Sequence, residues 1–198
     1  MSRFIETIRA ENGVPQMISL HQQRVDRTLK KWPGSQPVDL SALLSGLDFH
    51  AYPSTRIRIE YGTKGFIKVE TFEYFVRQVR SVRIMEIGAR AYRYKYADRE
   101  WIIELLRASG CDEIIMARGG MVTDASIANL AFFNGKEWLT PEEPLLPGTQ
   151  RQMLMEKGVI KAVPITLENL STYKVFKLMN AMLPWNESPE LDMGILTW

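Results

Sequence analysis

The sequence predicts a two-domain protein in which an α+β segment precedes an α/β segment. The first half contains two strand–turn–strand patterns around helical stretches. The second half alternates helical and strand-like stretches, with glycines at the ends of both longer helices. With 198 residues, of which 45% are hydrophobic, the chain can bury the core of one large domain or of two small ones.

The N-terminal half is expected to hold two hairpins and two helices. Residues 4–10 alternate between apolar and polar side chains and precede a turn sequence at 11–13, which is the pattern of a hairpin. Asp39 is expected to cap the second helix, because its carboxylate can accept hydrogen bonds from N–H groups of the first turn. The expected strands are 4–10, 17–20, 56–61, 66–74 and 82–86, and the expected helices are 21–32 and 40–47.

The C-terminal half is expected to begin after a short linker at residues 87–90, which divides the chain into domains 1–86 and 87–198. Gly110 and Gly158 follow helical stretches and are expected to end them. The expected helices are 99–109, 149–157 and 167–173, and the expected strands are 113–118, 121–123, 129–133, 137–140, 160–165 and 175–179.

The composition excludes several classes of partner and site. A net charge of +2 gives no long-range field that would attract nucleic acid or an anionic membrane, and no stretch is long and apolar enough to span a bilayer. The single cysteine, Cys111, excludes disulfides within the chain and favours a cytoplasmic location. Because His21 and His50 lack the spacing of metal ligands, no metal site is expected.

Lys95 is the first residue with the chemistry of a catalytic site. It stands between tyrosines in the sequence YRYKY at residues 92–96. A lysine that forms a Schiff base needs an apolar wall that lowers its pKa, since only the neutral amine attacks a carbonyl. The stretch is also compatible with a solvated lysine on a strand, or with a basic aromatic strand that stacks single-stranded nucleic acid. The near balance of charge in the rest of the chain disfavours the nucleic-acid interpretation.

Two further features suit a cofactor that has a pyridine ring and a phosphate. Such a cofactor needs a carboxylate against its ring nitrogen and backbone N–H groups of a helix N-terminus around its phosphate. Asp124 is the candidate carboxylate, and Gly148, Thr149 and Gln150 begin a helix that would supply the N–H groups. The alternatives are a turn aspartate for Asp124 and a helix cap solvated by water.

At these residues the sequence resembles the class IV aminotransferases of fold type IV, which include branched-chain and D-amino-acid aminotransferases and 4-amino-4-deoxychorismate lyase. The resemblance extends from Phe4 to about Pro184, and its motifs follow the family's order. The motifs are FIETIR (4–9), HQQR (21–24), YKYADR (94–99), VTDASIANL (122–130), LTP (139–141), LPGTQR (146–151) and NAM (180–182).

This resemblance implies a D-amino-acid aminotransferase-like fold with a shortened N-terminus, in which pyridoxal 5′-phosphate lies between the domains and forms a Schiff base with Lys95. It implies Lys95 and Thr7 as catalytic residues, and Arg24 as the arginine that binds the cofactor phosphate. Asp124 stands where the family has a glutamate. The implied cofactor-binding residues are Arg24, Lys95, Asp124, Gly148, Thr149, Gln150 and Asn180.

Within the family, the sequence is most similar to the lyases. Residues 180–184, NAMLP, are similar to an NALMP run of the lyases, and Arg99 follows Lys95 at their spacing. The expected activity is the conversion of aminodeoxychorismate, a small amine, to 4-aminobenzoate and pyruvate. The alternatives are an amino-acid transaminase of the branched-chain or D-amino-acid type and a non-catalytic homologue that binds the cofactor. The resemblance also implies a homodimer, because the family builds each active site with residues from the neighbouring subunit.

Overall fold

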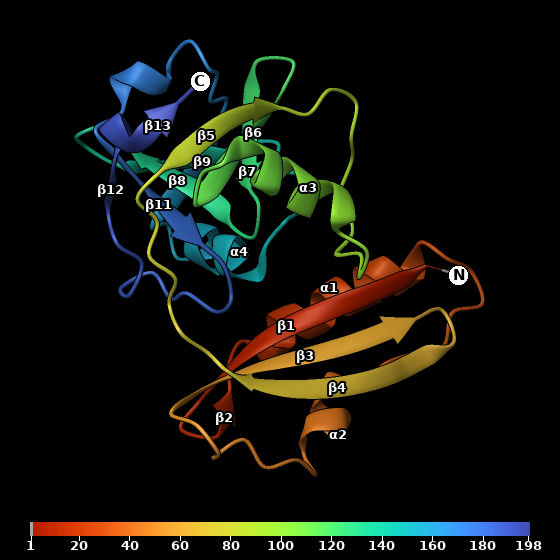
Figure 1. The fold of residues 1–198 in the computed structure, drawn as a ribbon. Coiled ribbons are helices and arrows are strands. Elements are labelled where there is room, and N and C mark those ends of the chain that lie inside the picture. Colours follow the sequence, from red (N-terminus) through yellow and green to blue (C-terminus); the bar gives the residue numbers. More distant parts are fainter. Residues whose placement is uncertain (1) are drawn as a thin grey trace. The chain divides into compact units, whose positions relative to one another are not determined.

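A computed structural model describes residues 2–198 (Figure 1). The contacts divide the chain into two compact units, and the chain passes between them more than once. Unit 1 consists of the residues up to Val76 together with Tyr94–Asp98, and unit 2 consists of Arg77–Arg93 and Arg99–Trp198. The expected domain boundary after residue 86 stays a prediction.

Unit 1 is an antiparallel four-stranded sheet in the order β2-β1-β3-β4, with helix α1 packed along β1 (Figure 1). Alternate residues of β1, namely Phe4, Ile8 and Ala10, are fully buried and share a core with Val25 and Leu29 of α1. The elements are β1 (Arg3–Glu11), β2 (Val14–Pro15), α1 (Ile18–Lys30), α2 (Leu40–Leu44), β3 (Ser54–Gly62) and β4 (Gly65–Glu73).

The sequence correctly placed most elements of unit 1, but the strand expected at 17–20 is wrong. Met17 has a left-handed backbone conformation, with φ 52°, and it precedes the first residue of α1. Leu20 then takes its place in a buried helical stripe with Arg24 and Thr28 at four-residue spacing. The predicted cap of α2 is confirmed, since the Asp39 carboxylate accepts a 3.0 Å hydrogen bond from the backbone N–H of Ala42.

The segment that carries Lys95 returns to unit 1 and lies beside β1. The backbone N–H of Ile5 donates to the carbonyl of Lys95 at 2.9 Å, and the N–H of Ala97 donates to the carbonyl of Arg3 at 2.9 Å. The rings of Tyr94 and Tyr96 pack around Phe4. Two backbone hydrogen bonds and this aromatic cluster therefore fix the position of the lysine on unit 1.

Unit 2 contains two sheets that share one apolar core. The five-stranded sheet has the order β10-β9-β8-β11-β12, and the four-stranded sheet has the order β13-β5-β6-β7. Core residues come from both sheets, for example Ile115 of β6 and Phe132 of β8. The strands are β5 (Val82–Glu86), β6 (Glu113–Arg118), β7 (Met121–Ala125), β8 (Asn129–Phe133), β9 (Trp138–Pro141), β10 (Ile160–Val163), β11 (Val175–Met179), β12 (Leu191–Asp192) and β13 (Leu196–Thr197). The helices are α3 (Glu100–Ser109) and α4 (Thr149–Glu156), with 3-10 turns at Leu170–Thr172 and Met193–Ile195.

Both predicted helix ends in unit 2 are confirmed, because Gly110 and Gly158 adopt φ values of 66° and 67° that favour glycine. The helix expected at 167–173 is wrong, since only the 3-10 turn is present. Thr166 and Asn169 exchange side-chain-to-backbone hydrogen bonds of 3.0 and 3.1 Å, and such local bonds compete with helical ones. Within residues 2–198, no helix has the length and apolar character needed to cross a membrane.

Candidate functional site

Unit 1 contains a buried cluster of three charged or titratable side chains at the start of α1. The carboxylate of Glu6 accepts hydrogen bonds from Nε and Nη2 of Arg24, at 2.8 and 2.5 Å. The Nδ1 atom of His21 lies 2.5 Å from Oε2 of the same carboxylate. All three side chains are buried, and β1 and the first turns of α1 hold them together.

Within this cluster, the positive charge of Arg24 compensates the negative charge of Glu6. Burial alone would raise the pKa of Glu6, but the Arg24 charge and the hydrogen bonds from His21 and Arg24 outweigh it and lower the pKa to about 2. Burial lowers the pKa of His21, and although Glu6 raises it, Arg24 and Lys95 lower it further. His21 is therefore neutral near pH 7, and an ionised Glu6 fixes the proton on Nδ1. Its Nε2 atom is buried and has no hydrogen-bond partner among residues 2–198.

Lys95 and Thr7 are the predicted catalytic residues, and both belong to unit 1. The influence of Lys95 on the pKa of His21 places its charge within electrostatic reach of the buried cluster. Thr7 is half-buried on β1, directly after Glu6, and is paired with Arg58 of β3. Because strand side chains alternate, Thr7 and Glu6 project from opposite faces of the sheet.

In unit 2, Asp124 is a buried acid near the end of β7. Its Oδ1 accepts a 2.7 Å hydrogen bond from Nδ2 of Asn129, and its Oδ2 accepts a 2.8 Å hydrogen bond from the backbone N–H of Leu146. Burial raises the pKa of Asp124 to about 7, although these two bonds and the charge of Arg151 act in the opposite direction. The same amide of Asn129 also donates to the carbonyl of Leu146, which ties β8 to the turn before α4.

The turn that begins α4 lies against Asn129. A Cβ atom on Gly148 would stand 2.0 Å from Oδ1 of Asn129, so the turn requires glycine at this position. Thr149 and Gln150 are buried at the first turn of α4, where backbone N–H groups have no helical acceptor. The Thr149 hydroxyl is buried and has no hydrogen-bond partner within the described chain, 2–198.

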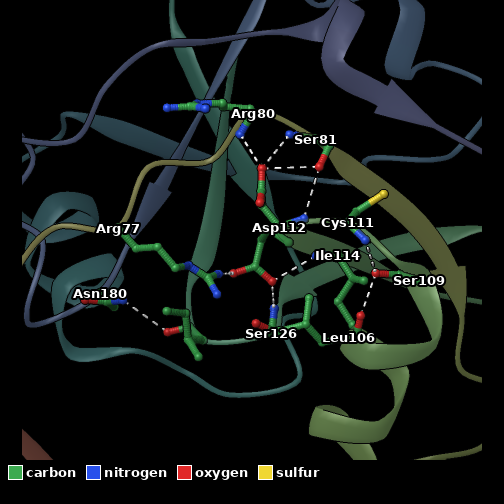
Figure 2. Close-up of polar contacts among 12 residues, drawn as sticks. Arg77, Arg80, Ser81, Leu106, Ser109, Cys111, Asp112, Ile114, Ser126 and Asn180 are labelled. Carbon is green, nitrogen blue, oxygen red and sulfur yellow. Dashed lines mark hydrogen bonds and ion pairs between the residues drawn. The ribbon is translucent and has the colours of Figure 1, made fainter.

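Both polar atoms of the Asn180 side chain form hydrogen bonds within unit 2. Its Nδ2 donates to the carbonyl of Ile127 at 3.1 Å, a contact drawn in Figure 2, and its Oδ1 accepts from the backbone N–H groups of Met182 and Leu183. These bonds connect the turn after β11 to the loop between β7 and β8. A direct contact of Asn180 with a cofactor stays a prediction.

A model of the amino-transferase class IV family matches residues 73–186, which is more than half of the chain. The protein belongs to this family. A Haemophilus influenzae protein described only as uncharacterised is 37% identical over 186 residues, which cover 92% of this chain and 98% of that protein.

Solved structures of similar proteins support the same family and fold. A crystal structure from Haemophilus somnus 129PT, provisionally named as a 4-amino-4-deoxychorismate lyase, is 36% identical, with a TM-score of 0.85 and coverage of 93% of this chain and 98% of that one. A hypothetical aminotransferase from Mycobacterium tuberculosis, solved with PLP bound, has a TM-score of 0.75 over 96% of this chain and 80% of its own; at 16% identity it shows the fold alone. The expected fold is confirmed, and the protein is an enzyme of a PLP-dependent family.

The predicted site residues of this class IV aminotransferase form two groups, one in each unit. Unit 1 carries Thr7, Arg24 and Lys95, and unit 2 carries Asp124, Gly148, Thr149, Gln150 and Asn180. Sequence reasoning missed Glu6 and Asn129, which hold Arg24 and Asp124 in place. Both lie inside motifs of the family resemblance, and that membership was the available signal.

Ser126 is a further buried polar residue of this class IV aminotransferase that the sequence did not single out. Its backbone N–H donates to Oε1 of Glu113 at 3.0 Å, a bond drawn from the labelled Ser126 in Figure 2. The carbonyl of Ser126 accepts a hydrogen bond from Nη2 of Arg99. The other Glu113 oxygen accepts a 3.0 Å bond from Arg77. The Ser126 hydroxyl is buried without a hydrogen-bond partner among the residues that the structure describes, 2–198.

Proposed function

We propose that this class IV aminotransferase is a pyridoxal-phosphate-dependent lyase that converts 4-amino-4-deoxychorismate to 4-aminobenzoate and pyruvate. The observation that carries the proposal is a pair of buried polar groups in unit 2 that suits this cofactor: the Asp124 carboxylate, which is held by hydrogen bonds, and the Thr149 hydroxyl, which has no hydrogen-bond partner among residues 2–198. In unit 1, the buried Arg24 guanidinium suits a phosphate. The lyase-like residues 180–184 and the spacing from Lys95 to Arg99 favour the lyase over a transaminase.

Lys95 is assigned as the residue that bonds covalently to the cofactor and moves protons. The bound cofactor supplies an electron sink for the carbon from which a proton or a leaving group departs. With the cofactor and substrate bound, the amine of Lys95 would take up and return protons beside that carbon. Lys95 suits this task because its carbonyl accepts a hydrogen bond from Ile5 of β1, Ala97 donates a second one to Arg3, and tyrosines flank the lysine in sequence.

Asp124 is assigned to the ring nitrogen of the cofactor. An ionised carboxylate keeps such a nitrogen protonated, which maintains the ring as an electron acceptor. Asn129 and the N–H of Leu146 hold both carboxylate oxygens in position before any ligand arrives. This preorganisation supports the assignment, because the carboxylate does not need to be reoriented when the cofactor binds.

The cofactor phosphate is assigned to Arg24, to the first turn of α4 and to the hydroxyl of Thr149. Glu6 holds Nε and Nη2 of Arg24 and thereby fixes the plane of the guanidinium. The unpartnered Thr149 hydroxyl and the N–H groups of Thr149 and Gln150 form a neutral donor set at a helix N-terminus, which favours an anion.

The proposal also includes a cytoplasmic location, which the single cysteine supports.

The first experiment tests the cofactor and its lysine. Purified protein should absorb visible light, and borohydride should fix the cofactor on Lys95, as peptide mapping by mass spectrometry would show. Lys177 is a matched control because it is another lysine beside aromatic rings. Label on Lys177 or on any lysine other than Lys95, or no bound cofactor at any concentration, would contradict the assignment.

The second experiment separates the candidate activities. The lyase should release pyruvate and 4-aminobenzoate from aminodeoxychorismate without a keto acid as second substrate. An amino-acid transaminase should instead transfer the amino group of a branched-chain or D-amino acid to a keto acid. A protein that binds the cofactor but turns over neither type of substrate would be a non-catalytic homologue, and the lyase proposal would then be wrong.

A further inference from the structure

We propose that Glu113 is a positioning residue of the candidate site: it fixes the turn between β7 and β8 and, through that turn, holds the Asp124 carboxylate in its binding orientation. All of the contacts that support this role lie within unit 2. Because the proposed function assigns Asp124 to the ring nitrogen of the cofactor, the role of Glu113 rests on that function, whereas the contacts themselves can be tested in the cofactor-free protein.

The turn that joins β7 to β8 carries the chain from one sheet of unit 2 to the other. β7 belongs to the four-stranded sheet and β8 to the five-stranded sheet. Asp124 lies on β7 and Asn129 is the first residue of β8, so the 2.7 Å hydrogen bond between their side chains joins the two sheets. The backbone N–H of Ala125 closes the turn with a 2.8 Å bond to the carbonyl of Ala128. The conformation of residues 125–128 therefore decides whether the amide and the carboxylate meet.

Three side chains from outside the turn hold its backbone. Oε1 of Glu113 accepts a hydrogen bond from the N–H of Ser126 at 3.0 Å, and Nη2 of Arg99 donates to the carbonyl of the same residue. Nδ2 of Asn180 donates to the carbonyl of Ile127 at 3.1 Å. These side chains come from β6, from the start of α3 and from the turn after β11. The backbone of the turn therefore cannot shift without the loss of several hydrogen bonds.

Glu113 supplies an acceptor at the point where the sheet ends. The pairing between β6 and β7 ends at Ile115 and Ala125, and the next residue along the chain is Ser126. A buried N–H without an acceptor costs free energy comparable to that of a lost hydrogen bond. The side chain of Glu113 is fully buried and accepts the N–H of Ser126, and its Oε1 also accepts the N–H of Ile114 at 2.9 Å. Glu113 thus takes the place of a strand partner for the first residue of the turn.

The charge of Glu113 is compensated from the surface of unit 2. Nη2 of Arg77 donates to Oε2 of Glu113 at 3.0 Å, and the Arg77 side chain is 49% exposed whereas that of Glu113 is 0% exposed. Figure 2 shows Arg77, Ile114 and Ser126 around this carboxylate. Hydrogen bonds that involve an ionised group are about twice as strong as neutral ones. A carboxylate with an arginine partner therefore holds the Ser126 N–H more firmly than an uncharged amide would.

The backbone amide of Leu146 reports on the position of Asp124, because its N–H donates to Oδ2 of Asp124 at 2.8 Å. In the cofactor-free protein, Glu113→Leu should accelerate hydrogen exchange at this amide about ten- to a hundredfold, as measured by NMR. A hydrogen bond to a charged group shifts a local equilibrium by about that factor. The protected amides of β11, inside the five-stranded sheet, should keep their exchange rates, since release of the turn is a local opening.

Glu113→Gln tests whether the hydrogen bond to the turn is the feature that matters. The glutamine oxygen can still accept from Ser126, whereas the charge and the bond from Arg77 are lost. Because a neutral hydrogen bond is about half as strong, Glu113→Gln should accelerate exchange at Leu146 only about three- to tenfold. If Glu113→Leu does not fold, this smaller effect of Glu113→Gln, compared with Glu86→Gln, decides in the same way.

Glu86 offers a matched control, because its carboxylate also holds the backbone of a turn. It accepts hydrogen bonds from the N–H groups of Gly119 and Gly120, at 2.8 and 3.4 Å. This turn joins β6 to β7 at the end of β7 away from Asp124. Glu86→Leu and Glu86→Gln should therefore leave hydrogen exchange at Leu146 unchanged.

In the presence of cofactor, Glu113→Leu should act through the ring nitrogen alone. It should raise the dissociation constant of pyridoxal phosphate about tenfold, because Asp124 is no longer held in place. It should not change that of an analogue with C–H in place of the ring nitrogen, since the analogue has no N–H for Asp124. A wild type that binds both ligands equally well would contradict the proposed role of Asp124, and the exchange experiment would still decide the role of Glu113.

Results in the cofactor-free protein would overturn the proposal in any of three forms. The first is an unchanged exchange rate at Leu146 in Glu113→Leu. The second is an equal acceleration at Leu146 and throughout β11, which would mean that Glu113 only stabilises unit 2 as a whole. The third is an equal effect of Glu113→Leu and Glu86→Leu on Leu146.

Discussion

Replacing Asp124 with asparagine should remove a pH dependence of stability that this carboxyl group gives to the cofactor-free protein. Burial raises the pKa of Asp124 to about 7, from an ordinary value of 3.8. The bonds from Leu146 and Asn129 and the charge of Arg151 reduce this shift but do not cancel it. The native protein therefore binds the Asp124 proton more tightly than the unfolded chain does.

The sign and the size of the effect follow from this difference in pKa. A carboxyl group with a raised pKa contributes stability that is complete below pH 3.8 and is lost as the pH rises through about 7. Each pH unit within this window costs about 1.4 kcal/mol, so the total is about 4 kcal/mol. Between pH 5 and 7 the free energy of unfolding of the wild type should fall by about 2 kcal/mol relative to Asp124→Asn.

Urea unfolding of both proteins without cofactor, at unit steps from pH 5 to 8, measures this difference. Subtraction of the two curves cancels the titration of groups that both proteins share, including His21. If the two curves are parallel across this range, Asp124 titrates as an ordinary carboxyl group and the argument from burial is refuted. With pyridoxal phosphate bound, the wild-type slope should flatten, because a protonated ring nitrogen would stabilise the ionised carboxylate.

Three further predictions concern the residues that hold the proposed cofactor and their supports. Arg24→Ala should weaken binding of pyridoxal phosphate about 10- to 100-fold in fluorescence titrations, while binding of pyridoxal without its phosphate stays unchanged; equal losses for both ligands would exclude a phosphate contact. Glu6→Gln should destabilise the protein by about 3–5 kcal/mol in urea unfolding, because it leaves the buried Arg24 without its carboxylate. Gly148→Ala should lower cofactor affinity, since its Cβ would displace the Asn129 amide, whereas Gly46→Ala, which meets nothing within 4 Å, should bind normally.

Local sequence signals were sufficient for elements whose determinants lie within a few residues. The cap at Asp39, the helix end at Gly110 and the strands β3 and β4 depend on near neighbours, and the structure confirms them. The strand expected at 17–20 failed because Leu20 belongs to helix α1, which packs against β1 through Val25 and Leu29. The two-residue strands β12 and β13 carry too little pattern to be detected.

In the candidate site, too, local sequence motifs identified some residues, whereas contacts set by tertiary packing were missed. Lys95, Arg24 and Asp124 were identified through motifs, because their residue types and order in the chain resemble those of the family. Their partners could not be derived in this way, since the contact of Glu6 with Arg24 is set by the tertiary packing of α1 on β1. Whether the identified residues bind the cofactor as assigned stays a prediction for the experiments above.

Glu6 and Asp124, which are two of the buried acids, are in opposite electrostatic situations, and this difference bears on what each of them can do. Glu6 has a guanidinium within hydrogen-bond distance, so its charge is compensated before any ligand arrives and its pKa falls to about 2. The hydrogen-bond donors to Asp124 are neutral groups, the Asn129 amide and backbone N–H groups that include that of Leu146, and the charge of Arg151 does not compensate fully. A ligand with a cationic N–H group would supply the compensation that Asp124 lacks, whereas it would gain little from Glu6. Glu6 is therefore suited to hold Arg24 in place, and Asp124 is the acid suited to bind the ring nitrogen of a pyridine cofactor.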